Sequence, residues 1–256
     1  MKYEFTKELP EFSFDFDHPD HRIIRQFHKE QMEELFHKPT LLPRPENTPS
    51  RTYRHSKRVA QDIHDFARFI GLNEERANHL KFATELHDIG KLDIPLKILD
   101  KPGKLTDAEL TEMKRHTIYG AQRIKSCQAD HPILDLAYNI AMFHHERMDG
   151  KGYHNTPPEE IPIYVRLVQV CDIFDAISAR RPYRTDREQM SAYDVMSAMI
   201  IDDGFLYHEV DQLVTRAFIT MKCYLLDTGL SHKEREDLLS RVGQIPELWS
   251  GEIDVA

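Results

Sequence analysis

Residues 73–91 carry the clearest structural signal in the chain and read NEERANHLKFATELHDIGK. Asn73 is a favourable helix N-cap, because its side-chain oxygen can accept a hydrogen bond from the first turn. Leu80 and His87 fall on the same face of a helix with 3.6 residues per turn. A glycine soon afterwards is suited to end the segment. We therefore predict a helix from Asn73 to about Asp88 that turns a histidine towards the core.

Apolar residues recur at helical spacing on both sides of this segment, and Gly and Pro residues separate the repeats. No convincing alternating strand is found, so the body of the chain is predicted to be an all-α helical bundle. The further helices are predicted at about residues 52–70, from Thr106 to Ile124, from Asp130 to His144, from Pro162 onward and, two or three of them, within residues 191–247.

The domain organisation is predicted from a change in composition near residue 50. Residues 1–50 hold phenylalanines among acidic residues, one predicted helix at about residues 20–37, and then a cluster of prolines. This segment is interpreted as an N-terminal extension with a Pro-rich linker. Residues 51–256 are interpreted as one helical domain.

Composition restricts the function further. The net charge of −9 disfavours non-specific binding to DNA or to an anionic membrane, since such binding depends on Lys and Arg. No apolar run is long enough to cross a bilayer, and the first residues lack the order of a secretory signal, so we expect a soluble cytoplasmic protein. The three cysteines form no Cys-x-x-Cys pair and are expected to be reduced.

Histidine is abundant, with 15 residues in the chain, which prompts a search for metal ligands. A single histidine on an apolar face is usually a hydrogen-bonded core residue, but here five successive predicted helices each turn ligand-type side chains inward. Burying so many without a cation would cost on the order of several kcal/mol. The candidate metal ligands are His55, His87, Asp88, His116, His144, His145 and Asp172.

Asp88 has a special position in this set. Adjacent residues on a helix differ by about 100°, but near the end of a helix both His87 and Asp88 can reach a shared cluster. A carboxylate with two oxygens can bridge two ions about 3.5–4 Å apart, a spacing suited to the hydrolysis of a phosphodiester. We therefore predict that Asp88 bridges two metals.

Five motifs in this order extend the pattern: HDIGK at 87–91, KPGKLT at 101–106, HHERMDGKGY at 144–153, DIFDA at 172–176 and RPYR at 181–184. Over roughly residues 51–225, the chain resembles the HD-GYP phosphodiesterases, a branch of the HD phosphohydrolase superfamily. The resemblance implies an HD-domain helical bundle with the additional C-terminal helices of the HD-GYP type. It also implies hydrolysis of a cyclic dinucleotide such as cyclic di-GMP, to the linear dinucleotide or GMP, by a hydroxide held between two metals.

The resemblance also assigns roles to residues. One metal would be held by His55, His87, Asp88 and Asp172, and the other by Asp88, His116, His144 and His145. The family uses iron or manganese, although zinc or nickel also accepts such nitrogen and oxygen ligands. Asp88 and Lys91 would act in catalysis. Substrate would be contacted by Lys91, Asp175, Arg181 and Arg184, while ion pairing is the alternative role of the last three.

The chain departs from the family pattern at two places. Some members carry a Glu four residues before the first ligand and hold a third metal, but Arg51 stands here and cannot bind a cation, so two metals are predicted. Gly152-Tyr153-His154 replaces the Gly-Tyr-Pro motif, and the loop after it is about one residue shorter. That loop is associated with docking of diguanylate cyclases. His154 is interpreted as an exposed loop residue, with phosphate donation as the alternative.

Two other functions remain open at this stage. An HD hydrolase could act on a hybrid cyclic dinucleotide, a cyclic mononucleotide or an alarmone. The altered loop is also compatible with a catalytically silent metal-binding module that signals through a partner. The sequence does not decide between a monomer and a homodimer.

Overall fold

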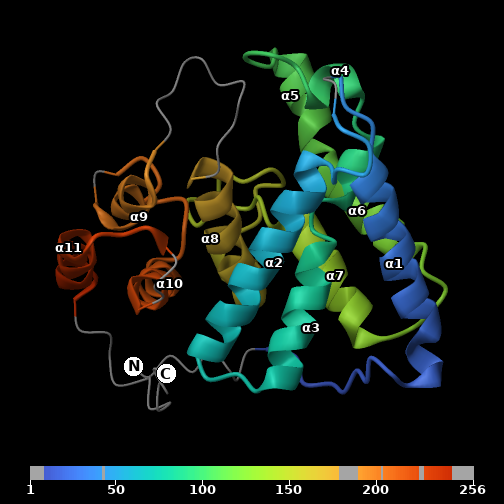
Figure 1. Ribbon diagram of the computed structural model, residues 1–256, viewed down its shortest axis with the longest axis horizontal. Helices are drawn as coiled ribbons and strands as arrows, with labels where there is room; N and C mark the ends of the chain where they lie inside the picture. Colours follow the sequence, from blue (N-terminus) through green and yellow to red (C-terminus); the bar gives the residue numbers. More distant parts are fainter. Residues whose placement is uncertain (1–8, 42–43, 179–189, 203, 225–227, 244–256) are drawn as a thin grey trace.

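The computed structural model describes residues 9–41, 44–178, 190–202, 204–224 and 228–243 (Figure 1). Within these ranges every regular element is a helix, as predicted, and the helices pack as a bundle. The central helices are α2 (Arg51–Phe69), α3 (Glu74–Glu85), α7 (Pro132–Phe143) and α8 (Ile163–Ser178). They pack α2 on α3 and α8, and α7 on α3 and α8.

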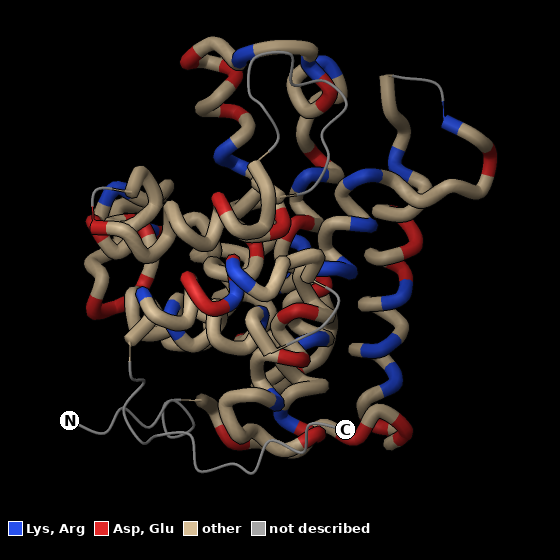
Figure 2. Tube along the Cα trace, turned by 60° about the vertical axis from the view of Figure 1, so that its left-hand side comes forward, with Lys and Arg blue, Asp and Glu red and all other residues tan. Residues whose placement is uncertain are grey.

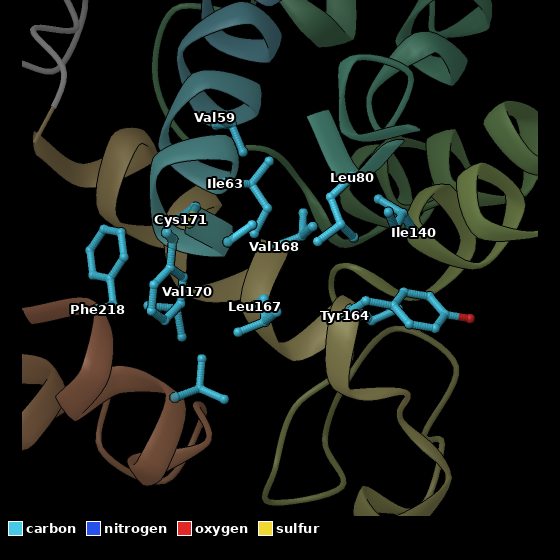
Figure 3. Close-up of a cluster of buried hydrophobic side chains, with 14 of the residues drawn as sticks. Val59, Ile63, Leu80, Ile140, Tyr164, Leu167, Val168, Val170, Cys171 and Phe218 are labelled. Carbon is cyan, nitrogen blue, oxygen red and sulfur yellow. The ribbon is translucent and has the colours of Figure 1, made fainter. Parts of the chain in front are cut away.

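A common hydrophobic core joins these four helices. Val59 and Ile63 of α2 lie beside Leu80 of α3, Ile140 of α7 and Val168 of α8, and all are buried (Figure 3). Burying a side chain of this size is worth about 1.5–3 kcal/mol relative to leaving it exposed. The core therefore fixes the relative positions of the helices that carry the candidate ligands.

Residues 73–91 fold nearly as predicted. Asn73 caps α3, accepting a hydrogen bond from the amide of Arg76. The helix ends at Glu85 rather than at Asp88, however, and His87 and Asp88 lie in the turn that leads into the 3-10 helix η3 (Ile89–Asp93). Leaving the helix frees the two neighbouring side chains from a fixed 100° separation, so both can face the same point.

The helix predicted from Thr106 to Ile124 is two helices. Thr106 and Glu109 form the predicted capping box at the start of α5 (Asp107–Lys114), but α6 (His116–Lys125) begins anew after Arg115. No residue of α5 is buried, whereas α6 buries His116 and Thr117. The break thus lets α6 pack against η3 and α7 independently of α5. The short helix α4 (Leu96–Leu99) precedes α5.

At the next predicted start, His131 rather than Asp130 caps the helix, since its ring nitrogen accepts a hydrogen bond from the amide of Ile133. The start of α8 just after Pro162 agrees with the prediction. Between these helices, the loop after α7 contains the short 3-10 helix η4 (Pro158–Glu160).

The N-terminal part packs on the bundle. The predicted helix at 20–37 is present as η2 (Pro19–His21) followed by α1 (Arg22–His37), which contacts α2 and η3. Lys38, just after α1, is buried and donates a hydrogen bond from Nζ to the carbonyl oxygen of Leu92, 2.9 Å away. The boundary drawn near residue 50 remains a prediction about domain organisation.

Three helices follow the central bundle, in agreement with the two or three predicted: α9 (Ala192–Ile200), α10 (Gln212–Tyr224) and α11 (His232–Val242). A partly buried ion pair between Lys222 Nζ and Asp62 Oδ1, 2.6 Å apart, connects α10 to α2. Acidic and basic residues are interspersed along the described chain (Figure 2). None of the helices in the described ranges has the length and apolar content needed to cross a lipid bilayer.

Candidate metal centre

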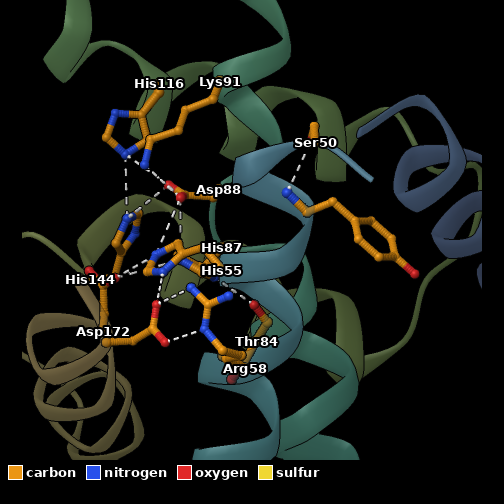
Figure 4. Close-up of polar contacts among 12 residues, drawn as sticks. Ser50, His55, Arg58, Thr84, His87, Asp88, Lys91, His116, His144 and Asp172 are labelled. Carbon is orange, nitrogen blue, oxygen red and sulfur yellow. Dashed lines mark hydrogen bonds and ion pairs between the residues drawn. The ribbon is translucent and has the colours of Figure 1, made fainter. Parts of the chain in front are cut away.

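The structure brings all seven predicted ligands to one place inside the bundle. His55 comes from α2, Asp172 from α8, and the others from the ends or starts of the elements around them (Figure 4). Three overlapping groups of ligand atoms lie within 4.8 Å of one another: His55, His87 and Asp172; His87, Asp88 and His144; and His116, His144 and His145. The convergence comes from packing of segments more than 100 residues apart.

The first half of the centre is formed by His55, His87 and Asp172. The Nε2 atom of His55 lies 2.9 Å from Oδ1 of Asp172, and the Nε2 atom of His87 lies 3.9 Å from the same oxygen. We refer to these three residues as half-site A. Two imidazole nitrogens and one carboxylate oxygen are a suitable ligand set for a divalent transition metal.

The second half is formed by His116, His144 and His145, which we call half-site B. The Nε2 atoms of His116 and His144 are 3.4 Å apart. Both rings donate from Nδ1 to backbone carbonyl groups, His116 to Met113 and His144 to Ile140. In the neutral rings, both Nε2 atoms therefore point lone pairs at each other, an arrangement that a cation between them would make favourable.

Asp88 lies between the half-sites. Its Oδ2 is 3.5 Å from Nε2 of His87 and 3.7 Å from Nε2 of His55. Its Oδ1 is 3.5 Å from Nε2 of His116 and 3.7 Å from Nε2 of His144. One oxygen thus faces each half-site, which is the placement that a bridging carboxylate requires.

Hydrogen bonds outside the centre fix the orientation of its histidines. His87 donates from Nδ1 to the carbonyl oxygen of Thr84 over 2.8 Å, and Nδ1 of His55 lies 2.6 Å from Oδ2 of Asp175. Arg58 in turn binds both oxygens of Asp175, at 2.6 and 2.9 Å. Such outer partners set the tautomer and leave Nε2 free to bind metal. Sequence reasoning missed Arg58, although it lies one helical turn after His55.

Buried polar atoms without hydrogen-bond partners are a second observation that fits a metal centre. Among the described residues, neither the buried Nε2 of His87 nor the buried Oδ1 of Asp88 has a hydrogen-bond partner. An unsatisfied buried polar atom costs about 1–3 kcal/mol. Cations at the two half-sites would satisfy both atoms, since both face the space between the ligands.

Burial governs protonation in the centre. It lowers the pKa of His87 to about 4 and the pKa of His116 to about 3, so both rings are neutral near pH 7. Burial also disfavours charge on His55, but hydrogen bonds with Asp172 and Asp175 outweigh it and raise the pKa of His55 to about 9. A cation bound at Nε2 of His55 would take the place of that proton.

The residues predicted to act in catalysis or to contact substrate do not all lie at the centre. Lys91 lies at the centre, with Nζ 2.6 Å from Oδ2 of Asp88, and its charge helps to hold the pKa of the buried Asp88 well below the usual range. Asp175 is engaged with a histidine and an arginine, the ion-pair alternative considered above. Arg181 and Arg184 lie outside the described residues. Arg51 is exposed on the first turn of α2.

The loop after half-site B differs from expectation at His154. This residue is not exposed: it is partly buried, and its Nε2 lies 2.9 Å from the hydroxyl oxygen of Thr117 in α6. Glu146, which the sequence analysis did not single out, is buried and accepts hydrogen bonds from the amides of His154 and Thr156, each 2.7 Å long. The loop is therefore fixed against the centre.

Comparison with known proteins identifies the class. Residues 44–202 match the family model described as HD domain, so the chain belongs to the HD domain family. It is 39% identical over 186 residues to the cyclic di-GMP phosphodiesterase of Thermotoga maritima, covering 72% of this chain and 48% of that protein. It is 40% identical over 134 residues to 3'3'-cGAMP-specific phosphodiesterase 2 of Vibrio cholerae, covering 52% of this chain and 25% of that protein.

The fold is also found in a solved structure. Bd1817, an HDG"Y"P protein from Bdellovibrio bacteriovorus, superposes with a TM-score of 0.53 at 19% identity, covering 68% of this chain and 53% of that chain. This likeness supports the fold alone. The chain spans about half or less of the length of the curated relatives named above. The predicted all-helical HD-domain fold and the resemblance to HD phosphohydrolases are confirmed.

Proposed function

We propose that the chain is a metal-dependent phosphodiesterase that hydrolyses a cyclic dinucleotide, with cyclic di-GMP as the first candidate and the linear dinucleotide or GMP as product. The observation that carries the proposal is the position of Asp88, with one carboxylate oxygen facing each of two histidine-rich half-sites. An arrangement of this kind suits in-line displacement at phosphorus.

The proposed cofactor is a pair of divalent ions, iron or manganese. The ligand set consists of imidazole nitrogens and carboxylate oxygens without a thiolate, which suits these metals. Half-site A with Asp88 would hold one ion, and half-site B with Asp88 the other. The ions would supply activation of water and neutralisation of the charge that develops on phosphate oxygens.

Residues of the chain would orient and neutralise the substrate. Lys91 is partly exposed, and its ammonium group lies beside Asp88, where it can donate a charge-assisted hydrogen bond to a phosphate oxygen. Asp175 holds the ring of His55 through Nδ1, and Arg58 holds Asp175. Arg181 and Arg184 remain the proposed contacts of the nucleotide, because a guanidinium fork suits phosphate or a guanine edge.

The identity of the substrate is supported by the relatives, one of which is named for cyclic di-GMP and one for 3'3'-cGAMP. A hybrid cyclic dinucleotide is therefore the second candidate substrate. Two further proposals come from the sequence: a cytoplasmic location, and docking of a diguanylate cyclase on the loop at Gly152-Tyr153-His154. Assembly as a homodimer is proposed as the alternative to a monomer.

The test is an anaerobic assay of the full chain reconstituted with iron or with manganese. Cyclic di-GMP and 3'3'-cGAMP are supplied separately, and products are separated by chromatography. We expect metal-dependent conversion of one of them, and loss of that conversion in Asp88→Asn, which keeps the shape of the side chain but removes its charge. Binding of cyclic di-GMP without conversion, with either metal, would favour the silent signalling module instead.

A further inference from the structure

His145 differs from the other histidines of the centre in how its ring is held. His55, His87, His116 and His144 each place Nδ1 on a carbonyl or carboxylate oxygen outside the centre. Within the described part of the chain, no hydrogen bond or ion pair is found for the ring of His145. Its orientation therefore depends on packing.

The packing partner of His145 outside the centre is Tyr153. The centroids of the two rings are 4.5 Å apart and their planes are tilted by 34°. Tyr153 also meets His116 edge-on, with centroids 6.2 Å apart, and the ammonium group of Lys114 lies 5.0 Å from the centre of the tyrosine ring. On the inner side, the ring of His145 lies against the rings of His144 and His116, with centroids 4.1 and 5.0 Å away. A displacement of Tyr153 would thus remove the contact that holds His145 from outside the centre.

Contacts of the residues on both sides of Tyr153 in the chain determine where it lies. On the N-terminal side, Gly152 packs against Glu146 so closely that a Cβ atom would lie 2.4 Å from Cα of Glu146. The carboxylate of Glu146 also accepts the amide hydrogen of His154. These contacts fix the backbone of the loop to the residue that directly follows His145.

On the C-terminal side, the ring of His154 fixes the loop to α6. The hydroxyl of Thr117 donates to the carbonyl oxygen of Lys114 over 3.1 Å, so its single hydrogen is used. The 2.9 Å contact between Thr117 Oγ1 and His154 Nε2 is then a hydrogen bond that His154 donates in the tautomer with its proton on Nε2. Thr117 is fully buried and directly follows His116, which makes it a rigid anchor.

We propose that His154 is a positioning residue for half-site B: its hydrogen bond to Thr117 holds Tyr153 against His145 and so keeps His145 turned towards the metal. This inference rests on the proposed two-ion centre. A proline at this position would restrict the backbone without bonding to α6, whereas His154 holds the loop through a side-chain hydrogen bond that a single substitution can remove.

The test measures metal release rather than turnover. The full chain is loaded with manganese, and release into excess chelator is followed by the spin signal of free Mn²⁺. His145→Ala identifies which ion belongs to half-site B. In His154→Ala and in Thr117→Val we expect that ion to leave several-fold faster, up to the roughly 10-fold effect of losing a group bonded directly to a ligand, because His154 acts on His145 through Tyr153. Release of the half-site A ion should stay unchanged.

Two controls separate positioning from a general loss of structure. His154→Gln keeps a donor near the place of Nε2 and should restore slow release, and His232→Ala alters an exposed histidine of α11 and should have no effect. In the metal-free protein, hydrogen exchange of the His154 and Thr156 amides should accelerate in His154→Ala.

The inference is overturned if His154→Ala and Thr117→Val both release manganese as slowly as the wild type. It is also overturned if both variants release the two ions equally faster. A wild-type protein that holds no ion at half-site B overturns this inference together with the proposed two-ion centre. Two tightly held ions without hydrolysis of any cyclic dinucleotide would remove the proposed activity but leave the role of His154 intact.

Discussion

Gly90→Ala is expected to damage both the fold and the metal centre. A Cβ atom at this position would lie 1.9 Å from the carbonyl oxygen of His116 and 2.3 Å from the backbone nitrogen of Gly120, whereas real Cβ atoms essentially never come within 3.0 Å of such atoms. The backbone conformation of Gly90 is open to alanine, so the collision is the only penalty. To relieve it, η3 and α6 must separate by roughly 1 Å, and α6 carries His116.

Overpacking a core commonly costs about 1–3 kcal/mol. We expect about 3 kcal/mol here, because both colliding atoms belong to the backbone of one helix and cannot move aside separately. At about 2–4 °C per kcal/mol for a chain of this size, Tm should fall by roughly 6–12 °C. A ligand displaced by about 1 Å should also weaken metal binding at half-site B.

The assay combines thermal unfolding by circular dichroism with metal analysis of the reconstituted protein. Gly120→Ala is the matched control, since it adds the same methyl group to the other side of the same contact. Its Cβ would lie 3.3 Å from the nitrogen of Gly90, and the gain in helix propensity offsets part of the crowding, so we expect Tm to change little. Equal effects of the two substitutions, or a Gly90→Ala protein with unchanged Tm and full metal content, would refute this reasoning.

Three further outcomes are expected. Asp175→Asn should weaken metal binding at half-site A by about 10-fold or more, because Asp175 orients His55; a raised KM for the cyclic dinucleotide with unchanged metal affinity would instead show that Asp175 contacts substrate. Lys222→Met should lower the free energy of unfolding in urea by about 3 kcal/mol, since it leaves the carboxylate of Asp62 largely buried and unpaired; Asp62→Asn in the same chain should restore most of the loss, and no recovery would contradict the pairing. Burial lowers the pKa of His79 from the usual 6.5, helped by the charges of Arg76 and His131 and opposed by that of Glu75. Below about pH 6.5 the unfolded chain therefore binds a proton that the folded chain does not bind at His79, and stability falls as pH falls. Tm measured from pH 7 to pH 5 should decline less steeply in His79→Gln, and equal slopes would exclude this contribution.

The sequence predicted those parts of the fold that depend on local patterns. Asn73 at the start of α3 and the capping box at Thr106 are local hydrogen-bonding devices, and both are present. The break at Arg115 has no such signal, since neither Gly nor Pro stands near it, and it arises because α6 packs on η3 while α5 stays exposed. The predicted C-terminus of α3 lies too late in the chain because the prediction relies on Gly90 as the end signal, whereas the helix ends at Glu85.

The candidate ligands could be identified from the sequence more completely than most of the fold, because His and Asp side chains on apolar helix faces require partners when they are buried. The contacts that hold these side chains could not be predicted. Glu146 fixes the loop through backbone amides eight and ten residues away, and His154 reaches Thr117 across 37 residues. Distances of this kind depend on how helices pack, and no local pattern records them.

The most direct test of the two-ion centre is a crystal structure of the metal-loaded protein with anomalous diffraction measured at the absorption edge of the metal. We predict two anomalous peaks about 3.5–4 Å apart, one among His55, His87 and Asp172 and the other among His116, His144 and His145, with the carboxylate of Asp88 between them. A single peak, or a carboxylate of Asp88 that contacts neither ion, would contradict the account.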